Sequence, residues 1–166
     1  MLAYAESRHW VHTNVYLGVS VEDQATAEER MPLLCAIPRP WKLFVSYEPA
    51  LGPVTFRPEW LERIDWLIIG GESGPGARPF YIDWINPVRD ACREIGTAFF
   101  VKQYGSNPYI IMDTLYAIPF KEWTKEPITG KGNHPDEWMQ NHRVRELPPD
   151  IAAIMALYGK AERVTA

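Results

Sequence analysis

The chain has 166 residues, of which 46% are hydrophobic and 23% are charged. This length and composition predict one globular domain, or one domain with a tail, and exclude disorder for most of the chain. The formal net charge of -4 argues against non-specific binding to nucleic acid or anionic membranes, because both depend on an excess of cationic side chains. A local basic patch remains compatible with this charge.

Cys35 and Cys92 are the two cysteines, and both fall within amphipathic patterns. They predict buried, reduced thiols in preference to a disulfide, which is typical of a cytoplasmic protein. The first residues contain no apolar run, and no stretch of about 18 consecutive apolar residues occurs anywhere. We therefore expect neither a signal peptide nor a membrane span.

Apolar runs alternate with helical patterns as far as residue 101. Strands are predicted at 15–19, 43–45, 66–69 and 98–101, and helices at 23–36, 59–64 and 84–95. Pro32 predicts a kink or an early stop in the first helix, because proline removes an internal hydrogen bond. In the third helix, Asp83 is predicted as the N-cap and Gly96 as the stop.

The spacing of the strands predicts how they are connected. Their starts are 28, 23 and 32 residues apart, which fits βα units and fits hairpins poorly. We therefore predict an α/β fold with a parallel sheet, in which residues 1–105 form a (β/α)4 partial barrel. The strands are nearly continuous apolar runs, as expected when both faces of a sheet are buried.

The pattern weakens after Gly105. Residues 106–149 mix proline, glycine, tryptophan and charge without a sustained period, which predicts irregular structure packed by its aromatic side chains. A short helix is predicted over 149–158. We assign residues 106–166 to a C-terminal segment that is distinct from the partial barrel.

Each predicted strand is followed by polar residues, and the carboxyl ends of parallel strands meet at one edge of the sheet. Polar residues after a strand are ordinary loop features, but four such ends in succession favour a shared pocket. No catalytic residue is assigned. The candidates for ligand binding are Ser20, Glu22, Glu48, Gly70, Gly71, Glu72, Arg78, Lys102 and Gln103.

Glu48 and Lys102 are the strongest single candidates. Glu48 precedes Pro49, which favours an extended conformation at Glu48. Its carboxylate could bind a substrate amine or ribose hydroxyls, or it could form a salt bridge to Lys102. Lys102 stands at the end of a buried strand, where it needs either a carboxylate or an anionic ligand.

The segment 70–78 begins with four glycines in seven residues. Glycines permit a close approach of the backbone to a ligand, and equally a wide structural turn. The segment is neither a P-loop nor a GxGxxG motif. Arg78 could make a bidentate contact to a carboxylate or phosphate, or it could simply be solvated.

Neither a zinc site nor a hydrolase nucleophile is indicated. The histidines, at 9, 12, 134 and 142, form no HxxxH or HExxH spacing, and the cysteines form no CxxC. No serine lies in a GxSxG motif. We expect no metal site in this chain.

Four sequence blocks resemble an uncharacterised phage and bacterial protein family related to radical-SAM enzymes. The blocks are NVYLGVSVEDQ (14–24), SYEPALGPV (46–54), DWLIIGGESGPGARP (65–79) and FFVKQYG (99–105), and GNHPDEWMQNHRVRELP (132–148) is similar to the family's terminal segment. The resemblance covers about residues 12–149. It implies the second half of a (β/α) barrel, in which Ser20, Glu48, Gly70, Gly71 and Glu72 line the face toward SAM or substrate.

The resemblance also implies a departure from the family. Its members usually carry, ahead of these blocks, a three-cysteine motif that binds a [4Fe–4S] cluster, and this chain has no such region. Two dispersed cysteines cannot supply the three thiolates that the cluster needs. SAM and the cluster are therefore implied only for full-length relatives, and we expect this chain to bind no cluster and to cleave no SAM.

Two functions are compatible with the sequence. The chain is either the C-terminal half of a radical-SAM-like enzyme, inactive alone or completed by a separate chain with the cysteine motif, or a non-catalytic interaction or scaffold module. A four-unit parallel sheet leaves its outer strands and one apolar face uncovered. We therefore expect a homodimer, with the C-terminal segment around Trp123 and Trp138 covering the remainder.

Overall fold

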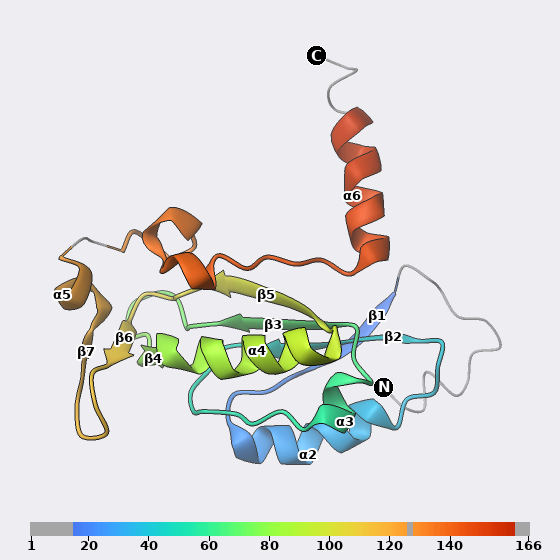
Figure 1. Cartoon of the computed structure of the whole chain (residues 1–166), viewed down its shortest axis with the longest axis horizontal. Helices are drawn as coiled ribbons and strands as arrows, with labels where there is room; N and C mark the ends of the chain where they lie inside the picture. Colours follow the sequence, from blue (N-terminus) through green and yellow to red (C-terminus); the bar gives the residue numbers. More distant parts are fainter. Residues whose placement is uncertain (1–14, 126–127, 162–166) are drawn as a thin grey trace.

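The structure is a computed structural model that describes residues 15–125 and 128–161. Its centre is a four-stranded parallel sheet in the order β1-β2-β3-β5, with helices on one side of it (Figure 1). The predicted α/β class and the parallel pairing are confirmed. The strands are β1 (Tyr16–Ser20), β2 (Lys42–Tyr47), β3 (Trp66–Gly70) and β5 (Ala98–Gln103), and the helices are α2 (Gln24–Cys35), α3 (Pro58–Leu61) and α4 (Ile85–Ile95).

The two faces of this sheet differ in burial. Alternate residues of β2, such as Leu43 and Val45, are fully buried, while Phe44 between them is partly exposed. The same alternation runs through β3 and the start of β5. Within residues 15–125 and 128–161, helices cover only one face, and side chains on the other face are partly exposed. The prediction that both faces are buried is therefore wrong for this part of the chain, because the strand sequences carry apolar residues on both faces.

The residues at which α2 and α4 begin and end were predicted only in part. Asp23 caps α2, since its side chain accepts a hydrogen bond from the Thr26 amide at 2.9 Å. Pro32 does not end α2, which continues to Cys35. The prediction that Asp83 caps α4 is wrong. The Asp83 carboxylate instead accepts a hydrogen bond from the Ile111 amide at 2.8 Å. Gly96 ends α4 with a φ of 90°, as predicted.

The segment 106–149 is more regular than predicted. It contains β6 (Pro108–Ile111) and β7 (Ala117–Pro119), which form a second sheet with β4 (Phe80–Tyr81) in the order β4-β6-β7. The segment also contains the helix α5 (Phe120–Thr124) and the 3-10 turns η2 (Pro135–Glu137) and η3 (Gln140–His142), while a further 3-10 turn, η1 (Ile82–Trp84), lies between β4 and α4. The strands escaped prediction because each is too short to show a period.

Residues 143–148 run along the outer edge of β5. The Val101 amide donates to the Val144 carbonyl at 2.8 Å, and the Glu146 amide donates to the Phe99 carbonyl at 2.9 Å. The Arg145 guanidinium lies 4.6 Å from the centre of the Phe100 ring. The expectation that the last strand leaves its backbone edge open is therefore wrong.

The chain then enters α6 (Pro149–Ala161), which projects away from the sheet (Figure 1). The foot of this helix is fixed to the start of β1, because the Tyr16 hydroxyl donates to the Asp150 carboxylate at 2.6 Å. No helix in the described part of the chain is long and apolar enough to cross a membrane.

Candidate ligand-binding edge of the sheet

Three glutamates follow three neighbouring strands, and each pairs with a cation. Glu22 after β1 pairs with Arg30 at 3.0 Å, Glu48 after β2 with Lys102 at 2.8 Å, and Glu72 after β3 with Arg78 at 2.8 Å. The carboxyl edge of the sheet is therefore lined by ion pairs. Of the three, only the pair of Glu48 and Lys102 joins residues far apart in the chain.

The pair of Glu48 and Lys102 bridges from β2 to β5, across the strand between them. The Glu48 side chain is 15% exposed, while that of Lys102 is 52% exposed. A Cβ atom at Gly70 would lie 3.1 Å from the Glu48 carboxylate, so the absence of a side chain there leaves room for the pair. The structure thus bears out the salt-bridge alternative for Glu48, with the ammonium group still reachable from solvent.

Gln103 and Gly71 have structural contacts at this edge. Gln103 is buried, and its side-chain amide donates to the Gly71 carbonyl at 2.9 Å. The Gly71 amide donates to the Gln103 carbonyl at 3.1 Å. A Cβ atom at Gly71 would overlap the Tyr104 carbonyl and lie 2.8 Å from Cβ of Phe80, so this glycine serves close packing between chain segments.

The loop after β3 closes on itself through Glu72 and Arg78. The Arg78 side chain donates twice to the Glu72 carboxylate, at 2.8 and 2.9 Å, and the Arg78 amide donates a third bond at 2.9 Å. These bonds, led by those from the side chain, lower the pKa of Glu72 to about 2. The bidentate contact predicted for Arg78 is therefore made within the loop, as in the wide-turn interpretation.

Ser20 and Glu22 lie together beside α2. The Arg30 side chain donates to the Ser20 carbonyl at 2.7 Å and also pairs with Glu22. The Glu22 carbonyl accepts from the amides of Leu51 and Gly52. These hydrogen bonds connect the loop after β1 to the loop after β2 and hold the two loops together.

A buried network around His142 was not predicted from the sequence. The Tyr104 hydroxyl lies 2.6 Å from Nδ1 of His142, and Nε2 lies 3.1 Å from the Asn86 side-chain oxygen. Since an amide oxygen only accepts, Nε2 carries the hydrogen and Nδ1 accepts from Tyr104. Burial, with a smaller contribution from Arg89, lowers the pKa of His142 to about 4. The histidine is therefore neutral and ties η3 to α4 and to the residue after β5.

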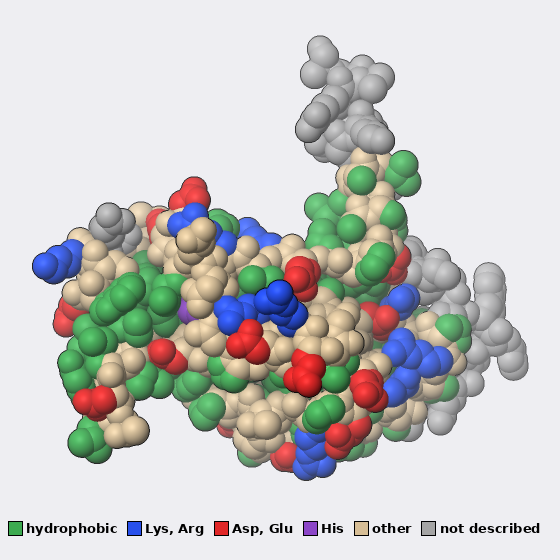
Figure 2. Space-filling view, viewed as in Figure 1, with side chains coloured by type: hydrophobic (Ala, Val, Ile, Leu, Met, Phe, Trp, Pro, Cys, Tyr) green, Lys and Arg blue, Asp and Glu red, His purple; other side chains and the backbone are tan. Residues whose placement is uncertain are grey.

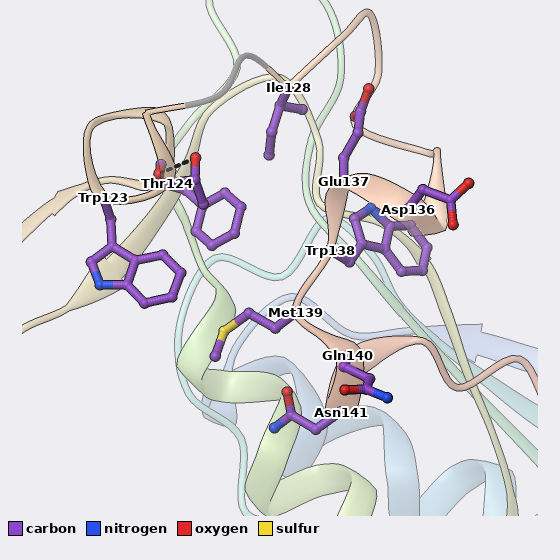
Figure 3. A pocket seen from close by; sticks show the side chains of 10 residues that line it. Trp123, Thr124, Ile128, Asp136, Glu137, Trp138, Met139, Gln140 and Asn141 are labelled. Carbon is purple, nitrogen blue, oxygen red and sulfur yellow. Dashed lines mark hydrogen bonds between the residues drawn. The ribbon is translucent and has the colours of Figure 1, made fainter.

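A groove of about 640 Å³ lies next to this network. Figure 3 shows Trp123 on one side of it and Trp138 on the other, with Met139 between them. Phe120 and Ile128 complete its apolar lining. Asp136, Glu137, Gln140 and Asn141 add polar groups. The groove is thus an aromatic cleft, built by the segment that was expected to be irregular.

The residues described here do not fit an iron–sulfur cluster. Cys35 ends α2 and Cys92 lies within α4, and both thiols are free. Burial raises the pKa of Cys92 to about 12 and raises that of Cys35, so neither favours the thiolate that iron requires. Over residues 15–125 and 128–161, no three His, Cys, Asp or Glu side chains gather in a metal-binding group. His9 and His12 lie outside those ranges.

The fold and the site together define an α/β protein whose parallel sheet carries paired charges at its carboxyl edge. The chain belongs to a family of proteins of unknown function, DUF5131, whose family model matches residues 1–143. No curated protein and no solved structure matches the chain.

Proposed function

We propose that this chain is a radical-SAM-like half-barrel that binds a polar small molecule, SAM or the substrate, at the carboxyl edge of its sheet. The observation that carries the proposal is the pair of Glu48 and Lys102, which meet across Gly70 at 2.8 Å. The sequence blocks that resemble the radical-SAM-related family contain both residues. Ligands of parallel α/β proteins bind beyond the carboxyl ends of the strands.

The two charges fit a ligand that carries an ammonium and a carboxylate group together. The carboxylate of such a ligand would take hydrogen bonds from the exposed Lys102 ammonium, and its ammonium would donate to Glu48. The methionine part of SAM has this chemistry. Each charge-assisted hydrogen bond contributes about 1.5–3 kcal/mol, so the site depends strongly on both side chains.

Cys35 and Cys92 fit a cluster poorly, so the proposal assigns no cluster chemistry to these two residues. The role proposed for this chain is to bind and orient the ligand.

Replacing Lys102 with methionine tests the proposed site. We expect equilibrium dialysis with labelled SAM to show binding to the unaltered chain, with unlabelled methionine as a competitor. Lys102→Met should weaken this binding by about 10-fold to 100-fold, because one charge-assisted hydrogen bond is lost. The matched control is Lys42→Met, since Lys42 pairs with Asp65 at 3.0 Å and begins β2 at the opposite edge of the sheet. Equal affinity in the two variants, or no binding by the unaltered chain, would refute the proposal.

A second candidate function is a non-catalytic interaction module. It is favoured by exposed apolar side chains on the β6–β7 hairpin, where Met112, Leu115 and Tyr116 all face solvent. Large exposed apolar patches mark interaction sites in soluble proteins. This candidate predicts that Lys102→Met leaves partner binding unchanged.

A further inference from the structure

The groove between α5 and η3 presents open aromatic surface to solvent. Trp123 is 43% exposed, and its ring stacks on that of Phe120, with centroids 5.7 Å apart and planes at 29°. Figure 2 shows hydrophobic side chains gathered at this end of the molecule, over the second sheet and α5. The face of an aromatic ring carries partial negative charge, and indole attracts cations more strongly than the other side-chain rings. The open ring of Trp123 therefore suits a cation.

The charged side chains that line the groove have one sign. Among its described lining residues, only Asp136 and Glu137 are charged, and both are acidic. The Glu137 carboxylate accepts from the amide of Thr129 at 3.2 Å and from its hydroxyl group. Both donors are neutral, so they do not cancel the charge of Glu137. The Asp136 side chain is 99% exposed and lies 3.5 Å from Arg143, where an ion pair is weak. The groove therefore disfavours anions.

Asn141 adds a hydrogen-bond acceptor to this lining. The Arg89 guanidinium, which can only donate, donates to Oδ1 of Asn86 at 2.8 Å. The Asn141 side-chain nitrogen donates to the same oxygen at 3.0 Å. The Asn141 oxygen is therefore turned away from Asn86, and Figure 3 shows it on the side of Met139. No described residue donates a hydrogen bond to this oxygen, so it can accept one from a ligand.

We propose that this groove binds a small organic cation, namely a protonated amine with an apolar body. The body packs against Trp123 and Met139, and the negative charge of Glu137 attracts the ammonium group. The volume of about 640 Å³ is within the range of about 300–1,000 Å³ that is typical of small-molecule sites. The groove shares no residue with the pair of Glu48 and Lys102, so the proposal does not depend on the ligand proposed there.

Three probes of similar size and different charge test the groove near neutral pH. They are phenethylamine, which is a cation, phenethyl alcohol, which is neutral, and hydrocinnamate, which is an anion. In a heteronuclear NMR titration of the full chain, phenethylamine should shift the indole resonance of Trp123 and bind with a dissociation constant of about 0.1–1 mM. The alcohol should bind about 10-fold more weakly, because it lacks the charge. Hydrocinnamate should cause no saturable shift.

Two substitutions separate the charge from the aromatic surface. Glu137→Gln keeps an acceptor for Thr129, and it should weaken phenethylamine binding about 5-fold to 10-fold while leaving the alcohol unaffected. Trp123→Ala should weaken the binding of both probes about 10-fold, because the ring is lost. The matched control is Glu122→Gln, since Glu122 is an exposed residue of α5 that does not line the groove. Its effect should stay below about 2-fold, because salt screens a distant exposed charge.

The dispersion of each NMR spectrum reports whether the variant is folded. An unaltered chain that does not bind phenethylamine would overturn the proposal. Equal affinity for the amine and the alcohol would overturn it as well, since the groove would then not select a cation. Unchanged amine binding in folded Glu137→Gln or Trp123→Ala would show that the amine binds elsewhere on the chain.

Discussion

Lowering the pH from 7 to 5 should reduce the free energy of unfolding by about 2 kcal/mol, with a further loss of about 1 kcal/mol by pH 4. The cause is His142, whose pKa falls from an ordinary 6.5 to about 4 on burial. Between these values the unfolded chain binds a proton that the folded chain does not. Stability from this residue is therefore complete above pH 6.5, declines as the pH falls toward 4, and changes no further below it.

Urea denaturation at a series of pH values measures this effect, with His142→Gln as the comparison. Glutamine keeps a donor and an acceptor but does not titrate, so its stability should vary little between pH 6.5 and 5. The carboxylates with a lowered pKa, such as Glu72 at about 2, titrate below this window. The interpretation fails if the unaltered chain and the variant show the same slope of stability against pH.

Gly71→Ala should destabilise the fold by about 3 kcal/mol, the upper range for forcing an atom into a packed interior. The added methyl group would overlap the Tyr104 carbonyl and lie within 3 Å of Cβ and Cγ of Phe80. The backbone around Gly71 cannot move easily. The Gly71 amide donates a hydrogen bond to the Gln103 carbonyl, and the Tyr104 amide donates one to the Gly132 carbonyl. Equilibrium urea denaturation followed by tryptophan fluorescence measures the loss.

Gly70→Ala is the matched control for this substitution. A methyl group at Gly70 would meet the Glu48 carboxylate at 3.1 Å and Cγ of Gln103 at 3.4 Å. The former is the end of a side chain that can move, so the expected loss is below about 1 kcal/mol. If both variants lost the same stability, the close approach at Gly71 would not be the cause.

The central sheet was predictable because its strands are strong local signals. The runs around Val45, Ile68 and Val101 are apolar, and their separation leaves room only for crossover connections. The second sheet gave no such signal: β4 has two residues and β7 has three. Its pairing depends on tertiary contacts, such as the bond from the Phe80 amide to the Asn107 carbonyl, which no local pattern contains.

The candidate site was predictable only where it depends on topology. Glu48 follows β2 and Lys102 is the second-last residue of β5, so a parallel sheet brings them to one edge. The pairing of Glu72 with Arg78 depends on the path of the glycine-rich loop, which glycine leaves open. The His142 network joins residues up to 56 positions apart through irregular segments, so sequence spacing carries no information about it.

The pairing of residues 144–146 with β5 has a consequence for the nascent chain on the ribosome. Each of the first three strands gains its neighbour as the next βα unit emerges, but the outer edge of β5 waits for roughly forty further residues. At about 5–20 residues per second this interval lasts roughly 2–8 s. During that time an apolar strand presents unsatisfied amide and carbonyl groups, which are a template for pairing with a neighbouring nascent chain. Slower translation after residue 103 should therefore favour aggregation during synthesis over productive folding.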